Sequence, residues 1–241
     1  MSVDYLIGVL GGMGPAATVD LMSKVIGLTR TGGDQLHVPL LVSSMPDFPD
    51  RSTYLLSGGP SPLPALLDRL QMLEKAGARC IVIPCNTAHY WFSELQAATS
   101  ALILNLIEEV AEAARQRGFS KVGLLATDAT VSTGLYPKAL EKNNVECIML
   151  QGPLQKAAME GIYLYKAGHL EEARQRLATP YRHLQHQKVE AIILGCSEVP
   201  LIMAKEIHQK PHYFLDSNQI LAEAIVRQYE QQTGKRVRKD Q

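Results

Sequence analysis

The chain has 241 residues, 46% of them apolar, so it can bury a sizeable core as one large domain or two small ones. Its 24 basic and 24 acidic residues balance, which argues against nucleic acid or a charged membrane surface as a partner. No apolar run approaches the ~20 residues of a membrane span, no basic leader precedes the first apolar run, and four cysteines do not suggest a disulfide framework. We therefore expect a cytoplasmic protein.

Short apolar runs alternate with longer segments of helical periodicity along the chain. Strands are predicted at residues 5–10, 39–43, 80–83, 102–106, 121–126, 145–150, 190–194 and 212–215. Helices are predicted at residues 16–29, 64–76, 107–116, 169–185 and 218–232. The stretches 45–51 and 57–64, rich in proline and glycine, are interpreted as loops and as a candidate mobile lid. This alternation predicts an α/β protein with mostly parallel sheets and right-handed crossovers.

The two halves of the chain carry similar signals in the same order. Residues 7–10 resemble residues 122–125, and a cysteine follows the third predicted strand of each half. We therefore predict an internal duplication with a pseudo-two-fold relation and an active site in the cleft between two domains. The first domain is expected at residues 1–100, joined by a C-terminal helix at 215–241, and the second at residues 101–214.

The most informative segments are Pro-Cys-Asn-Thr-Ala-His around Cys85 and Gly-Cys-Ser-Glu around Cys196. Each follows a buried strand and precedes a predicted helix start, with Asn86 or Thr87 and Ser197 as candidate N-caps. A helix N-terminus lowers the pKa of a nearby thiol and makes it a plausible base. Two such thiols predict an acid and a base on opposite faces of one small molecule.

The cysteines and the first glycine turn also have other interpretations. A single cysteine after a strand is more often a small buried apolar residue, and we read Cys80 and Cys147, which lie within apolar runs, as structural. No metal site is predicted, because the cysteine spacing does not match known ligand patterns. The turn Gly12-Met-Gly14 formally matches a dinucleotide fingerprint. Pro15 removes an amide from this turn, which favours a smaller anion such as a carboxylate.

Several polar residues are candidates for holding a ligand. Arg51, in a proline-flanked loop, is a candidate carboxylate clamp, although a surface arginine is the plainer reading. Lys166 is a weaker candidate for the same role. The Thr127 turn offers hydroxyls and amides to an anion, or simply caps a helix. Glu198 and His89 are candidates for orienting a thiol.

Taken together, the Gly-Gly-Met-Gly-Pro turn, residues 46–51 and the two cysteine motifs resemble the aspartate/glutamate racemase family, and the aspartate racemase branch most closely. Glu198 stands where glutamate racemases carry histidine, and Ser197 where threonine is usual. The resemblance implies two flavodoxin-like three-layer domains, no cofactor and a homodimer. It also implies that Arg51 and Lys166 bind the side-chain carboxylate and that the substrate backbone is surrounded by Met13, Gly14, Asn86, Thr87, Thr127 and Ser197.

The resulting hypothesis is cofactor-independent racemisation of aspartate, glutamate or both, with Cys85 and Cys196 exchanging the α-proton. Alternatives within the same superfamily are a hydantoin racemase, a decarboxylase or a cis–trans isomerase. A non-catalytic binding protein for an acidic metabolite and an NAD-dependent enzyme are alternatives from other classes. Aspartate and glutamate differ by one methylene group, which changes binding free energy in a pocket by only ~1–3 kcal/mol. The sequence therefore leaves both amino acids open as substrates.

Overall fold

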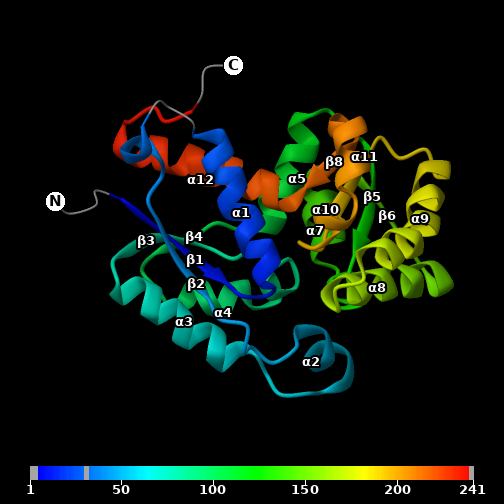
Figure 1. Ribbon diagram of the computed structural model, residues 1–241, viewed down its shortest axis with the longest axis horizontal. Coiled ribbons are helices and arrows are strands. Elements are labelled where there is room, and N and C mark those ends of the chain that lie inside the picture. The colour runs from blue at the N-terminus through cyan, green and yellow to red at the C-terminus, as the bar shows by residue number, and fades with distance from the viewer. Residues whose placement is uncertain (1–4, 30–32, 239–241) are drawn as a thin grey trace.

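The protein is built from two four-stranded parallel sheets with the same strand order. The computed structural model describes residues 5–29 and 33–238 (Figure 1). The first sheet has the order β2-β1-β3-β4 and consists of β1 (Leu6–Gly11), β2 (Leu40–Ser44), β3 (Ala78–Val82) and β4 (Leu102–Ile103). The second has the order β6-β5-β7-β8 and consists of β5 (Lys121–Ala126), β6 (Glu146–Met149), β7 (Ala191–Gly195) and β8 (Phe214–Asp216). The predicted α/β class and duplicated architecture are confirmed.

The strand predicted at 102–106 is shorter than expected. Asn105 caps the next helix, its side chain accepting hydrogen bonds from the amides of Ile107 and Glu108. β4 therefore ends at Ile103 and pairs with β3 in the first sheet. The domain boundary expected at residue 100 falls before this strand of the first sheet.

Helices and 3₁₀ turns flank the first sheet. They are α1 (Pro15–Leu28), η1 (Asp34–Leu36), α2 (Arg51–Ser57), α3 (Leu63–Lys75), η2 (Thr87–Trp91) and α4 (Phe92–Ala97). The prediction of a loop at Arg51 is wrong, because this residue begins α2. The Asp50 carboxylate caps this helix by accepting from the Thr53 amide at 2.8 Å, and Gly58 ends it with a positive φ of 74°.

The second half carries α5 (Leu106–Gln116), α6 (Asp128–Thr133), α7 (Leu135–Lys142), α8 (Gly152–Lys166), α9 (Leu170–His186), α10 (Val199–Ile202), α11 (Ala204–Gln209), η3 (Pro211–Tyr213) and α12 (Ser217–Thr233). α8 has no counterpart among the predicted helices. It packs along α9, and Gly161 makes this close approach possible: a Cβ on Gly161 would lie 3.0 Å from Leu177.

The C-terminal helix α12 leaves the second sheet and packs against α1 and α5 (Figure 1). Asn218 donates to the carbonyl of Ala17 at 3.0 Å, and Lys24 reaches Asp216 at 2.7 Å. The helix expected over 215–241 ends at Thr233; residues 234–238 are not helical, and residues 239–241 lie outside the described residues. These contacts tie the second sheet to the first helix of the chain.

Each sheet is covered on both faces, which gives three layers per half. One apolar core is shared: it includes Ile7 and Val9 of β1, Val122 and Leu124 of β5, and buried residues of α5 and α12. Separate apolar clusters fill the outer face of each sheet. Because the shared core spans both halves, the two sheets are held as one body. Among the described residues, no helix combines the length and apolar character needed to cross a membrane.

Candidate active site

A pocket lies where the carboxyl ends of strands from both sheets face one another. Met13 follows β1, Cys85 follows β3, Thr127 follows β5 and Cys196 follows β7. The pocket contains about 320 Å³ of empty space, part of it open to solvent, and is lined by Met13, Asp50, Arg51, Ser52, Cys85, Asn86, Thr87, Thr127, Lys166, Cys196, Ser197 and Glu198. The structure therefore gathers nearly all the predicted site residues in one place.

Two predicted site residues do not line this pocket directly. Gly14 lies at its edge, where a Cβ would come within 3.1 Å of Glu198 Oε1. His89 is buried behind the Cys85 turn; its Nδ1 lies 2.9 Å from the carbonyl oxygen of Cys85, and its Nε2 accepts from the Leu106 amide at 3.1 Å. Because Nε2 accepts, Nδ1 carries the proton and donates to that carbonyl. Burial lowers the pKa of His89 to about 4, so the ring is neutral and positions backbone, not the thiol.

Cys196 is held by a carboxylate. Its Sγ donates to Glu198 Oε2 at 3.0 Å, and both side chains are buried. Burial and the negative charge of Glu198 raise the pKa of Cys196 well above its ordinary value, and the opposing charge of Lys166 does not compensate. The expectation of a thiol with a lowered pKa is therefore wrong for Cys196. The helix after it, α10, is only four residues long and does not outweigh the lost hydration.

The residues expected to cap helices are used differently. Asn86 precedes a 3₁₀ turn and makes no side-chain cap, and Glu198, not Ser197, stands at the N-cap position of α10. Thr87 instead places its hydroxyl 3.1 Å from that of Thr127 and 2.8 Å from that of Thr130. This hydroxyl cluster joins the Cys85 turn to α6 of the other half. Thr127 does cap α6, accepting from the Thr130 amide at 3.1 Å.

Two cationic side chains enter the pocket from opposite halves. Arg51 stands at the start of α2, where its Nη1 donates to the carbonyl of Pro49 at 3.2 Å. Lys166 ends α8, and its Nζ lies 3.7 Å from Glu198 Oε1. Burial lowers the pKa of Lys166, but the acidic groups around it, Glu198 together with the thiols of Cys196 and Cys85, raise it by more, so the lysine is cationic. The pair presents two positive charges to an anionic ligand.

The structure adds two lining residues that sequence reasoning missed, Asp50 and Ser52. The pattern Asp-Arg-Ser-Thr is a helix start signal, because Asp50 stands three residues before Thr53. Recognising it would have placed Asp50, Arg51 and Ser52 in the first turn of one short helix.

The glycine turn after β1 does not present a dinucleotide site. The amide of Gly12 donates to Thr18 Oγ1 at 2.9 Å, inside the protein. A Cβ on Gly12 would lie 2.1 Å from the carbonyl oxygen of Met45, so this turn packs directly against the chain after β2. Gly12 is therefore a packing glycine, with a positive φ of 92° that suits it to this position.

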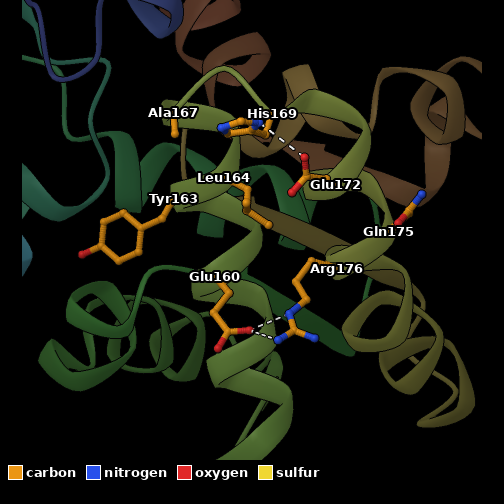
Figure 2. Close-up of a pocket in the computed structure, with 8 residues that line it drawn as sticks. All are labelled: Glu160, Tyr163, Leu164, Ala167, His169, Glu172, Gln175 and Arg176. Carbon is orange, nitrogen blue, oxygen red and sulfur yellow. Dashed lines mark hydrogen bonds and ion pairs between the residues drawn. The ribbon is translucent and has the colours of Figure 1, made fainter.

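A wider groove lies elsewhere, between α8 and α9 (Figure 2). Its polar side chains contact one another: Glu160 pairs with Arg176, and His169 Nδ1 lies 3.4 Å from Glu172 Oε1. By contrast, the pocket that contains Cys85 and Cys196 brings Arg51, Lys166 and both thiols into one small volume. Converging polar groups in a confined space are typical of an active site, so the smaller pocket is the candidate.

Comparisons with known proteins find similar amino-acid racemases. An aspartate racemase from Picrophilus torridus superposes with a TM-score of 0.84 at 32% identity, over 93% of this chain and 94% of that chain. The broad specificity amino-acid racemase RacX of Bacillus subtilis is 28% identical over 231 residues, 93% of this chain and 98% of the relative. A glutamate racemase from Thermus thermophilus is 32% identical over 163 residues, 66% of this chain and 58% of the relative.

The family model for Asp/Glu/hydantoin racemases matches residues 10–225, a range that includes both cysteine turns and all of both sheets except the start of β1. The chain therefore belongs to the Asp/Glu/hydantoin racemase family.

Proposed function

We propose that this amino-acid racemase inverts an acidic amino acid, aspartate or glutamate, by moving the α-proton between Cys85 and Cys196. The observation that supports this proposal is the placement of both thiols in one pocket, each at the end of the third strand of its half. A racemase that uses two bases needs one acid–base group on each face of Cα, and a pseudo-two-fold pair of turns supplies such an arrangement.

The charges of the pocket favour a dicarboxylic substrate. Arg51 offers a planar, bidentate donor set to a carboxylate, and Lys166 offers a second positive charge from the other half. One carboxylate of the substrate is the side-chain group, as the resemblance implied for these two residues. The hydroxyls of Thr87, Thr127 and Ser197 remain to receive the amino-acid backbone.

In the proposed reaction, one cysteine acts as a thiolate and takes the α-proton while the other acts as a thiol and protonates the opposite face. The C–H bond electrons move into the carboxylate to give an enediolate-like intermediate, and they return to Cα when the second proton arrives. Each hydrogen-bond donor that contacts this developing charge lowers the free energy of the transition state by about 3–4 kcal/mol. Glu198 accepts the proton of Cys196 when that residue must serve as the thiolate, because its Oε2 already receives that hydrogen bond.

The presence of two thiols favours this reaction over those alternatives that are not racemases; a hydantoin racemase is distinguished by its substrate. A decarboxylase or cis–trans isomerase of the same superfamily uses its cysteines differently, whereas two-sided proton transfer requires both. A protein that only binds an acidic metabolite needs Arg51 and Lys166 and tolerates the loss of either thiol. Retention of Cys85 and Cys196 in one pocket supports proton transfer.

We also propose that the protein functions as a homodimer. On α1, Val19 and Ile26 lie seven residues apart on one helix face and are 64% and 47% exposed. Exposed apolar side chains of this size are suited to burial against another surface. Sedimentation velocity of the protein and of a Val19→Glu, Ile26→Lys variant tests this: a wild-type monomer contradicts the dimer.

The deciding experiment is proton NMR of the purified protein in D₂O with L-aspartate and then L-glutamate. Loss of the α-proton signal together with appearance of the D-enantiomer is expected. Cys85→Ser and Cys196→Ser should each abolish inversion, because each removes the acid–base group of one face. Racemisation that survives either substitution contradicts the two-thiol mechanism, and no exchange with either amino acid contradicts the proposed substrates.

A further inference from the structure

The two cysteine-bearing turns are joined by one buried hydroxyl group, that of Ser217. This residue begins α12 and is fully buried. Its Oγ donates to the carbonyl oxygen of Leu194 at 3.0 Å and accepts from Asn86 Nδ2 at 3.2 Å. Asn86 directly follows Cys85, and Leu194 lies two residues before Cys196. The hydroxyl therefore bridges the strand end that carries one thiol and the turn that carries the other.

Tyr136 contacts the same two turns from α7. It is fully buried, and its hydroxyl donates to Asn86 Oδ1. Its ring lies against Gly195, where a Cβ would come within 3.1 Å of Cε2. The direction of the bridge is fixed by chemistry, since the carbonyl of Leu194 has no hydrogen and Ser217 must donate to it. Ser217 therefore accepts from the amide nitrogen of Asn86, which leaves the amide oxygen for Tyr136.

We propose that Ser217 and Tyr136 are positioning residues that fix the separation of the two thiols during proton transfer. The proposal rests on the proposed racemase function. Both residues are fully buried and neither is among the residues that line the pocket, so they act through Asn86 and the Cys196 turn and not on the substrate. Proton transfer from one thiol to the opposite face demands aligned atoms, and a misplacement of about 1 Å costs on the order of 100-fold in rate.

The test compares Ser217→Ala and Tyr136→Phe with the wild-type protein. Both variants should lose about 10–100-fold in kcat while KM stays close to wild type, because the Arg51 and Lys166 contacts are untouched. The isotope effect on kcat with α-deuterated substrate should rise toward its full value as proton transfer becomes more rate-limiting. Substitution of a residue with only a structural role would leave the isotope effect unchanged and would not lower kcat while leaving KM unchanged.

Two matched controls remove comparable groups elsewhere. Thr29→Val deletes a fully buried hydroxyl that donates to the carbonyl of Val25 at 2.8 Å, at the end of α1 opposite the pocket. Tyr229→Phe deletes the hydroxyl of another buried tyrosine, on α12. Both should change thermal stability without changing kcat. Tyr136→Phe keeps the packed ring and tests the proposal even where Ser217→Ala folds poorly.

A double variant supplies a further measurement. Because both hydroxyls act through Asn86, the combined loss in kcat should be smaller than the product of the single losses. Wild-type kcat and an unchanged isotope effect in both single variants, with an active wild-type protein, would overturn this inference alone. A wild-type protein that racemises no amino acid would instead remove the proposed function and this inference together.

Discussion

Cys196 donates a 3.0 Å hydrogen bond to a buried carboxylate, Glu198 Oε2, two residues along the chain. The same carboxylate has its other oxygen 3.7 Å from Lys166 Nζ. Glu198 therefore links a thiol to a cation contributed by a different helix. This arrangement keeps Cys196 protonated in the free protein, because burial and the negative charge of Glu198 both raise the pKa of this thiol.

Glu198→Gln should separate the two effects of this carboxylate. The substitution removes a negative charge, so the pKa of Cys196 falls and its alkylation by iodoacetamide becomes faster at pH 8. The same change removes the group that accepts the Cys196 proton, so kcat should fall by about 10²–10³-fold. Peptide mass spectrometry measures alkylation of Cys196 with Cys85 as an internal reference. A kcat equal to wild type would contradict the role of Glu198.

The cationic pair predicts a preference for ligands with two carboxylates. Arg51→Met and Lys166→Met each remove one charged hydrogen-bond donor, worth about 1.5–3 kcal/mol. The inhibition constant of succinate should therefore rise about 10–100-fold, whereas that of butyrate, which has one carboxylate, should rise much less. Lys156→Met is the control, because Lys156 is exposed on the same helix as Lys166. Equal losses for the two inhibitors would contradict a clamp for the second carboxylate.

The architecture, and the residues that meet in the pocket, could be predicted from the sequence because both depend on local patterns. Apolar runs predicted the strands, and glycines at helix ends helped to predict several helices. The position of Cys85 and Cys196 between a strand and a predicted helix start singled out these two thiols. Carboxyl ends of parallel strands meet at one edge, so these turns were expected to converge. The predicted strand at 121–126 has the bounds of β5.

The remaining features depend on tertiary contacts that no local pattern records. The pKa of Cys196 follows from its burial beside Glu198, and the four-residue motif that contains both residues does not report that burial. The hydrogen bond between Asn86 and Ser217 joins residues 131 positions apart in the sequence. Ser217 does follow the last strand of the second half, so a search of every strand end would have included it. Tyr136, in the first turn of α7, carries no comparable signal.

His89 predicts a specific loss of stability in mild acid. Burial lowers its folded-state pKa to about 4, below the ordinary value of 6.5 that we assign to the unfolded chain. The unfolded state therefore binds a proton first, and the free energy of unfolding should fall as pH decreases from about 6.5 toward 4. Between about pH 6.5 and pH 5 the loss from this residue is about 1.5 kcal/mol, before most carboxylates titrate.

Urea unfolding at a series of pH values measures this loss. In His89→Gln the titrating ring is absent, so the slope between pH 6.5 and pH 5 should be shallower than in wild type, whatever the stability of the variant at pH 7. His183→Gln, on the solvent-facing part of α9, serves as the control and should keep the wild-type slope. Identical slopes in all three proteins would show that His89 takes up its proton equally in the folded and unfolded states.

The contact between α1 and α12 contains a buried charge cluster whose loss should be costly. Lys24 Nζ lies 2.6 Å from Asp20 and 2.7 Å from Asp216, and all three side chains are less than one fifth exposed. Lys24→Met leaves two carboxylates buried together without their cation, which should cost about 3–5 kcal/mol in unfolding free energy. Lys142→Met is the matched control, because its partner Glu108 is a solvent-exposed carboxylate 3.0 Å away, and it should cost at most about 1 kcal/mol.

The pH dependence of the Lys24 variant identifies the cause of its instability. Burial raises the pKa of Asp216 even with Lys24 present, and removal of the lysine should raise it further. A folded-state pKa above the unfolded value means that protonation favours the folded state, so stability is lost as pH rises through this range. The deficit of Lys24→Met relative to wild type should therefore shrink as the pH is lowered from about 7 to about 5. A deficit that stays constant over this range would show that lost packing of the lysine side chain, and not unpaired buried charge, destabilises the variant.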